Sequence, residues 1–239
     1  MTERRLGRSA AFLDRDGVIN RDHGYVHRWE DFEFLPGVVE ALRRLQAAGH
    51  ALVIVTNQSG IARGLYGEAD VERLHERLRQ HLRGIGIELA AIEYCPHLPA
   101  STVPAYAVDC ECRKPAPGMI LRAAQALGID LARSMMVGDK SSDIEAARRA
   151  GVGHAFLVAT DGEGEPDALS PDLAHLLRLK LLQDAVEAWL RPEHVDAGPP
   201  ARLTEATGAT GATEAKDATG ATGATGATRA ADATGAIEP

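Results

Sequence analysis

The chain has 239 residues, a net charge of −8 and a charged-residue content of 25%. It lacks the basic patch of nucleic-acid-binding proteins, and no apolar run reaches the ~18 residues of a membrane helix. Because the three cysteines are an odd number, a disulfide framework is disfavoured. These features predict a cytoplasmic protein that binds neither nucleic acid nor membrane.

The composition changes near residue 193. Beyond this point Ala-Thr-Gly triplets recur and large apolar side chains almost vanish. Such a segment buries too little apolar surface to offset the entropy of ordering its backbone. We therefore predict a disordered Ala/Thr/Gly-rich tail at 193–239 and one domain at 1–192, which is long enough to form a sizeable core.

Short apolar runs alternate with helical patterns along the first 160 residues. Hydrophobic periodicity predicts strands at 10–13, 51–55, 92–94, 135–137 and 155–158, and helices at 37–48, 68–83, 117–127 and 142–150. The segment 170–190 is expected to be mainly helical, with a muddled pattern near 176–182 that has room for a short strand. This alternation predicts a three-layer, Rossmann-like α/β fold, with a parallel sheet and helices on both faces. No insertion is long enough for a large cap domain.

Two carboxylates, Asp14 and Asp16, directly follow the first predicted strand, and Gly17 follows them. They are expected at the carboxyl edge of the sheet, where open α/β folds bind ligands. Residues i and i+2 of a strand point to the same face. One carboxylate can therefore attack a substrate while the other transfers a proton.

Three further polar segments accompany this pair, and together they are more informative than an isolated Asp-x-Asp. Thr56 and Asn57 end the second predicted strand and offer donors for phosphoryl oxygens. The other two segments are Arg113-Lys114, which precedes a predicted helix, and the strand end that carries Asp139 and Asp143.

The three cysteines lie close together in the sequence, in the pattern Cys95-Pro96-His97 followed by Cys110-Glu111-Cys112. Three thiolates and one imidazole form a closed ligand set suited to structural zinc. The alternative is buried free cysteines beside a surface histidine, which the local spacing disfavours. Because this zinc loop directly precedes Arg113-Lys114, zinc is expected to fix the position of these two cations.

The order of these motifs resembles that of the haloacid dehalogenase superfamily of aspartate-nucleophile phosphatases. Together with the zinc loop, three sequences, Asp14–Asn20, Asp22–Val26 and Thr56–Gly60, narrow the resemblance to the heptose bisphosphate phosphatases. The histidinol-phosphate phosphatases are close relatives of that group. The resemblance covers residues 8–160, with a weaker fit to about 190.

The resemblance implies a covalent mechanism. Asp14 is expected to attack phosphorus and form an aspartyl-phosphate, and Asp16 to act as general acid and then general base. Thr56 and Lys114 are expected to stabilise the phosphoryl oxygens. Mg²⁺ favours carboxylate oxygens, and its expected ligands are Asp14, the backbone carbonyl of Asp16, and Asp139, with Asp143 behind them.

The resemblance also implies a set of substrate contacts. Asn57 is expected to contact the phosphoryl group, and the residues expected near the substrate are Asp22, His23, Gly24, Tyr25, Gln58, Ser59, Arg113 and Lys140. Simpler roles remain open for several residues. Thr56 can cap a turn, Asp143 can suit the first turn of a helix, Arg113 can be a surface cation, and His23 can be a solvated loop residue.

The function implied is hydrolysis of the C7 phosphate of a heptose bisphosphate, in the biosynthesis of nucleotide-activated heptose and lipopolysaccharide. Histidinol phosphate is the alternative substrate, since the catalytic core would be the same. A non-catalytic zinc scaffold is a third possibility, disfavoured because Asp14, Asp16 and Asp139 are all present. The expected partner is a small sugar phosphate, and the expected oligomeric state is a monomer.

Overall fold

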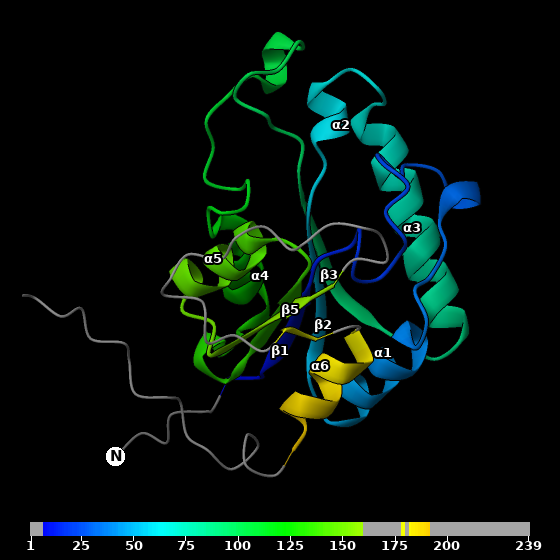
Figure 1. Ribbon diagram of the computed structural model, residues 1–239, viewed down its shortest axis with the longest axis vertical. Coiled ribbons are helices and arrows are strands. Elements are labelled where there is room, and N and C mark those ends of the chain that lie inside the picture. Colours follow the sequence, from blue (N-terminus) through cyan, green and yellow to red (C-terminus); the bar gives the residue numbers. More distant parts are fainter. Residues whose placement is uncertain (1–6, 160–177, 180–181, 192–239) are drawn as a thin grey trace, which may run out of the picture. The chain divides into compact units, whose positions relative to one another are not determined.

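The computed structural model describes residues 7–159, 178–179 and 182–191 (Figure 1). The chain divides into two units, Met1–Arg202 and Leu203–Pro239, and the second contains none of the described residues. The tail predicted at 193–239 therefore lies outside the described residues, as does most of the segment 160–181.

One parallel sheet forms the centre of the fold (Figure 1). Its strands run in the order β3-β2-β1-β4-β5-β6, and every neighbouring pair is parallel. The strands are β1 (Ala10–Leu13), β2 (Ala51–Asn57), β3 (Leu89–Cys95), β4 (Met135–Gly138), β5 (His154–Val158) and β6 (Arg178–Leu179). The direction of winding reverses at β1, which lies between β2 and β4. A ligand crevice is expected at such a switch point.

Helices cover both faces of the sheet, as the alternating pattern predicts. The helices are α1 (Val38–Ala47), α2 (Ser59–Ala62), α3 (Glu68–Gly84), α4 (Gly118–Leu127), α5 (Ser141–Ala150) and α6 (Leu182–Trp189). One core cluster joins Ala11 and Leu13 of β1 to α1, α3 and α6. The other joins Ala10 and Phe12 to α4 and α5. Because side chains alternate along a strand, the four apolar residues of β1 contribute to both cores, and the three-layer fold is confirmed.

Three short 3-10 helices interrupt the loops, at Trp29–Asp31, Pro104–Tyr106 and Leu131–Arg133. Within the segment 170–190, the described residues agree with the expectation, since β6 lies in the muddled region and α6 follows it, while 170–177 and 180–181 lie outside the described residues. Among the described helices, none combines the length and the hydrophobicity that crossing a bilayer requires.

The loop between β1 and α1 takes the place of a large cap domain within the described residues. Isolated bridges pair Asn20 with Asp16 and with Phe34, so the loop folds back on itself. Its aromatic side chains pack onto α3, where the rings of Trp29 and Phe34 lie 5.2 and 5.5 Å from that of His81.

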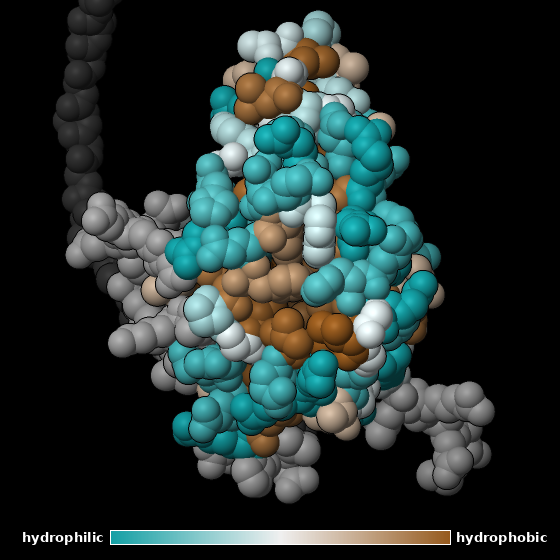
Figure 2. Space-filling view, turned by 90° about the vertical axis from the view of Figure 1, so that its right-hand side faces the viewer, coloured by the Kyte–Doolittle hydropathy of each residue, from teal (hydrophilic) through white to brown (hydrophobic). Residues whose placement is uncertain are grey.

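Figure 2 shows the side of the molecule on which α3 lies in Figure 1, where hydrophilic side chains surround a central hydrophobic area.

Candidate active site

The predicted catalytic residues meet at the carboxyl ends of the central strands. Asp14 follows β1, Thr56 is the second-last residue of β2, and Asp139 follows β4. A cavity of about 350 Å³ opens at this edge. Its lining comprises Asp14, Asp16, Asp22, Gly24, Tyr25, Thr56, Asn57, Gln58, Ser59, Tyr66, Lys114, Lys140, Ser142 and Asp143.

Lys114 connects two of the carboxylates. Its Nζ lies 2.8 Å from Asp14 Oδ1 and 2.6 Å from Asp143 Oδ1, and it donates to the Val55 carbonyl at 2.7 Å. Burial alone would lower the pKa of this lysine, but the Asp14 and Asp143 carboxylates outweigh burial and raise it. Lys114 is therefore a fixed positive charge beside the predicted nucleophile.

The backbone of Lys114 is held by Asn57. The Asn57 amide donates to the Lys114 carbonyl at 3.1 Å and accepts from the Lys114 amide N–H at 3.0 Å. This paired contact joins the end of β2 to the segment before α4. Asn57 lines the cavity, and its predicted contact with a phosphoryl group stays a prediction, while positioning of Lys114 is what its hydrogen bonds show.

A second cluster of charge surrounds Asp139. One carboxylate oxygen each of Asp139, Asp14 and Asp143 lies within 4.8 Å of the other two. Both Asp139 oxygens are buried without a hydrogen-bond partner among the described residues, although Lys140 Nζ is 3.5 Å from Oδ2. Burial, reinforced by the charge of Asp14, raises the pKa of Asp139 to about 8. Unpartnered oxygens in such a group are suited to binding a hard cation.

Gly17 permits the close packing of this cluster. The residue has a φ of +84°, and a Cβ placed on it would lie 2.5 Å from Asp139 Oδ2. A side chain there would displace the carboxylate, so the glycine that follows the two aspartates has a direct steric role.

Asp16 is surrounded by donors. Its carboxylate accepts hydrogen bonds from Arg15 Nη2 at 2.8 Å, Asn20 Nδ2 at 3.0 Å and Gln58 Nε2 at 3.1 Å. Burial raises the pKa of Asp16, while Arg15 and Asn20 oppose the rise. A carboxyl group with a raised pKa can carry a proton nearer neutral pH, as a general acid requires.

Sequence reasoning missed Arg15 and Asn20. Both are fully buried, and Arg15 also donates to the Val26 carbonyl at 2.7 Å, which ties the β1–α1 loop to Asp16. The arginine between two aspartates carries no sequence signal for burial, because it depends on the loop folding back over it. Asn20 follows an apolar pair and ends the first motif, and this position was the available signal.

Gln58 is buried within the same network. Its amide nitrogen donates to Asp16 and to Thr56 Oγ1, and its oxygen accepts from the Tyr66 hydroxyl at 3.0 Å. The Tyr66 ring lies against the backbone of Gly60, where a Cβ would come within 2.3 Å of the ring. The glycine of the Thr56–Gly60 motif thus admits the tyrosine that orients Gln58.

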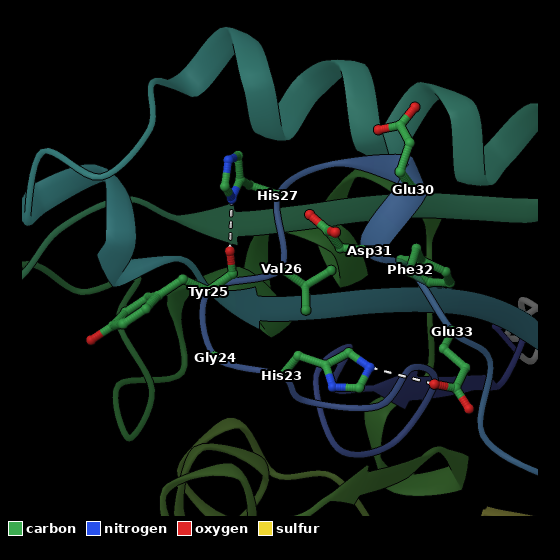
Figure 3. A pocket seen from close by; sticks show the side chains of 9 residues that line it. All are labelled: His23, Gly24, Tyr25, Val26, His27, Glu30, Asp31, Phe32 and Glu33. Atoms are coloured by element: carbon green, nitrogen blue, oxygen red, sulfur yellow. Dashed lines mark hydrogen bonds and ion pairs between the residues drawn. The ribbon is translucent and has the colours of Figure 1, made fainter.

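The predicted substrate contacts divide between two cavities. Asp22, Gly24, Tyr25, Ser59 and Lys140 line the cavity that holds the aspartates. His23 lines a neighbouring cavity of about 460 Å³ formed by residues 23–27 and 30–33, where its Nε2 lies 3.4 Å from Glu33 Oε2 (Figure 3).

Arg113 does not line the first cavity. Its Nη1 instead donates to the His97 carbonyl at 3.1 Å, which directly links Arg113 to the predicted zinc loop.

The predicted zinc ligands converge. Cys95, His97, Cys110 and Cys112 each place a ligand atom within 4.8 Å of the others. The sulfur–sulfur distances are 3.0, 3.3 and 3.6 Å, and no disulfide forms among them. In a tetrahedral site with Zn–S bonds of about 2.3 Å, sulfurs lie about 3.8 Å apart. The cluster is therefore close to the size that a bound zinc ion requires.

The same loop is anchored to α2 and α3. Ser101 Oγ donates to the Ala62 carbonyl at 2.6 Å, and the Tyr106 hydroxyl donates to Glu68 Oε1 at 2.7 Å. The loop thus contacts the elements that follow β2 and ends, at Cys112, directly before Arg113 and Lys114.

Known proteins are similar to this chain in sequence and in fold. A HAD-hydrolase-like family model matches residues 111–180. D-glycero-beta-D-manno-heptose-1,7-bisphosphate 7-phosphatase from Photorhabdus laumondii is 47% identical over 182 residues, which cover 76% of this chain and 95% of the relative. The Escherichia coli protein of that name is 52% identical over 159 residues, covering 66% and 83%.

The chain belongs to the heptose bisphosphate phosphatase family of the haloacid dehalogenase superfamily. A solved structure agrees with this placement. The D,D-heptose 1,7-bisphosphate phosphatase from B. bronchiseptica, complexed with magnesium and phosphate, is 34% identical. It matches with a TM-score of 0.62, and the match covers 76% of this chain and 98% of the other. Membership of this phosphatase family confirms the resemblance predicted from the motifs.

Proposed function

We propose that this protein hydrolyses the C7 phosphate of D-glycero-D-manno-heptose 1,7-bisphosphate, with preference for the β-anomer at C1. The anomer is taken from the names of the relatives. The observation that carries the proposal is the meeting of Asp14, Asp16 and Lys114 in one cavity at the switch point of the sheet, in a chain of this family.

Asp14 is the proposed nucleophile. Its carboxylate oxygen would bond to phosphorus as the bond between phosphorus and the sugar oxygen breaks, giving an aspartyl-phosphate. Lys114, 2.8 Å from Asp14 Oδ1, holds positive charge where negative charge gathers on the phosphoryl oxygens. The Thr56 hydroxyl lines the same cavity and is the proposed hydrogen-bond donor to one of these oxygens.

Asp16 is the proposed acid and base. In the first step it would give its proton to the departing sugar oxygen, and in the second it would take a proton from the water that attacks the aspartyl-phosphate. Three donors hold its carboxylate in place. The support for this role is the raised pKa of Asp16 together with its place in the cavity.

The aspartate cluster fits a magnesium ion. The proposed ligands are Asp14, the backbone carbonyl of Asp16, and Asp139, whose buried oxygens have no hydrogen-bond partner among the described residues. When bound, Mg²⁺ would offset the mutual repulsion of the carboxylates and the phosphate. Asp143 is paired to Lys114 and accepts from the Lys140 backbone N–H, so its proposed role is to position Lys114.

The cysteine cluster fits a structural zinc ion. The proposed ligands are Cys95, His97, Cys110 and Cys112, a closed set that leaves no open position for substrate. The hydrogen bond from Arg113 to the His97 carbonyl gives zinc an indirect influence on the site, through the segment that carries Arg113 and Lys114.

The decisive experiment is phosphate release in the presence of Mg²⁺. The β- and α-anomers of the heptose 1,7-bisphosphate are compared with histidinol phosphate as substrates of the full-length protein. We expect kcat/KM for the β-anomer to exceed the other two by about tenfold or more, which is about 1.4 kcal/mol of transition-state discrimination.

Each other outcome has a definite meaning. A preference for the α-anomer would overturn the proposed stereochemistry. A preference for histidinol phosphate would overturn the proposed substrate. Absence of Mg²⁺-dependent phosphate release from all three would overturn the proposed activity.

A further inference from the structure

The two lysines of the cavity are already engaged by carboxylates. Lys114 lies within 2.8 Å of Asp14 and Asp143. Lys140 Nζ lies 3.5 Å from Asp139 Oδ2 and 3.8 Å from Asp22 Oδ2. A substrate that carries a second phosphate, remote from the one that is cleaved, calls for positive charge near the mouth of the cavity in addition to these two lysines, which already face carboxylates.

Arg63 is an uncommitted cation next to that mouth. It follows α2 directly, and its side chain is exposed. Its guanidinium has no carboxylate or hydrogen-bond partner among the described residues, and its printed contact is with the Tyr25 ring, whose centroid lies 6.0 Å from Cζ. Arg113, by contrast, has a hydrogen-bond acceptor, because its Nη1 donates to the His97 carbonyl.

The Tyr25 ring lies next to Arg63, and Tyr25 itself lines the cavity. The tyrosine lines the cavity wall and is 44% exposed. Its φ of +57° lies in the left-handed region that non-glycine residues seldom adopt, and conformations of this kind concentrate at functional sites. Figure 3 shows its side chain pointing away from the other labelled side chains.

The conformation of Tyr25 is supported from both sides in the sequence. The Gly24 backbone N–H donates to Asp22 Oδ1 at 2.9 Å, and His27 Nδ1 lies 2.8 Å from the Tyr25 carbonyl (Figure 3). These contacts hold the backbone at Tyr25, from which the ring extends beside the arginine. A guanidinium that stacks on an aromatic ring keeps its N–H groups free in its own plane, where they can bind a phosphate through two hydrogen bonds.

We infer that Arg63, oriented by the Tyr25 ring, binds the remote phosphate of a bisphosphorylated sugar and so selects bisphosphates over monophosphates. This inference rests on the proposed function and assigns its specificity. Arg63 touches the part of the substrate that does not react, so its effect belongs mainly to KM.

The test compares two substrates that share the cleaved phosphate, the heptose 1,7-bisphosphate and heptose 7-phosphate. The quantity measured is the ratio of their kcat/KM values. In Arg63→Ala this ratio should fall about tenfold, chiefly through KM for the bisphosphate, since a charge-assisted bidentate contact is lost. Arg63→Lys, which keeps the charge without the planar stacking, should recover part of the loss.

Arg77→Ala is the matched control. Arg77 is an exposed arginine on α3 and does not line the cavity, so its removal should leave the ratio unchanged. Tyr25→Leu should reproduce the effect of Arg63→Ala on KM for the bisphosphate. Thermal unfolding of each variant checks that the fold is retained.

The variant tests the role of Arg63, and the wild-type protein tests the proposed function. An Arg63→Ala ratio equal to that of the wild type, or equal losses for both substrates, would overturn the role of Arg63. A wild-type protein without preference for the bisphosphate over heptose 7-phosphate would also overturn it. A wild-type protein that releases no phosphate from the heptose 1,7-bisphosphate would instead overturn the proposed function, whatever the variants do.

Discussion

Asp14 lies where a positive charge and a cluster of negative charges meet. Lys114 contacts it directly, and one carboxylate oxygen each of Asp139 and Asp143 lies within 4.8 Å of it. Such an arrangement leaves the carboxylate exposed to an electrophile in the cavity and holds its own charge in place. Replacing Asp14 therefore tests the chemistry of the site, and a substitution of the same shape limits the effect on folding.

Asp14→Asn should abolish turnover while retaining the fold. The amide has nearly the shape of the carboxylate, but it is too weak a nucleophile to form the phosphorylated intermediate, so kcat should fall roughly 10³-fold or more. Phosphate release measures the loss, and circular dichroism checks the fold. Appreciable residual turnover would rule out Asp14 as the nucleophile.

We expect Asp139 to make the proposed magnesium binding depend on pH. Its pKa is raised to about 8 by burial, above the usual value of about 3.9 in unfolded chains. In the metal-free protein, the stabilisation that comes from keeping this group protonated is complete below that unfolded value and is lost as pH rises through about 8. Mg²⁺ needs the deprotonated carboxylate, so the gain that it brings should grow over the same window.

The expected measurement is the difference in Tm with and without Mg²⁺, taken at several pH values between 5 and 8, as this window follows from the raised pKa. The difference should increase with pH in the wild-type protein. In Asp139→Asn it should be small at every pH. A difference in the wild type that is independent of pH would contradict the proposed role of Asp139.

Among the larger elements, the predicted zinc loop at 95–112 has only one short 3-10 helix, so its position depends on side-chain contacts. Its middle is held by Ser101 and Tyr106, and its two ends meet in the cysteine cluster. Because Arg113 follows directly and donates to the His97 carbonyl, displacement of the loop would shift the cations next to it.

Cys110→Ser should therefore lose bound zinc and raise KM for the substrate several-fold, with a smaller effect on kcat. Serine is a much poorer zinc ligand than a thiolate, and Asp14 and Asp139 directly follow β1 and β4, outside the loop. Zinc content is measured by elemental analysis, and kinetics by phosphate release. Loss of zinc with unchanged KM would show that the loop is positioned without the metal.

The sequence predicted the strand-end residues well because the carboxyl ends of parallel strands share one edge of a sheet. Asp14 and Thr56 line one cavity, and Asp14 and Asp139 belong to one carboxylate cluster, for this reason. Zinc-ligand spacing was equally informative, because four ligands within 18 residues can converge locally.

Other features needed the folded chain. The strand predicted at 92–94 extends over Leu89–Cys95 because it pairs with the full length of β2, and pairing overrides the weak β-propensity of its alanines. The four-residue helix α2 is too short to show a period. The burial of Arg15 depends on Phe32 and Val26, which reach it from a loop 11 to 17 residues away.

At the scale of the whole molecule, the site and the core end at different points along the chain. Every residue that lines the catalytic cavity falls between Asp14 and Asp143. The core extends further, because Leu182, Val186 and Trp189 of α6 are buried against α1 and the sheet. Catalysis should therefore tolerate removal of the last residues, whereas stability should depend on how much of α6 remains.

Two truncations test this separation. A protein that ends at residue 192 should keep the kcat, KM and Tm of the full chain, since it retains the cavity and α6. A protein that ends at residue 181 exposes the apolar surface that α6 covers. Burial of each large side chain contributes about 1.5–3 kcal/mol, so loss of three is comparable with the roughly 5–15 kcal/mol that stabilises a whole domain. This second protein should unfold at a much lower temperature or fail to fold. Equal Tm values for the two truncations would show that α6 does not stabilise the core, and a raised KM in the longer one would assign residues beyond 192 a role in binding substrate.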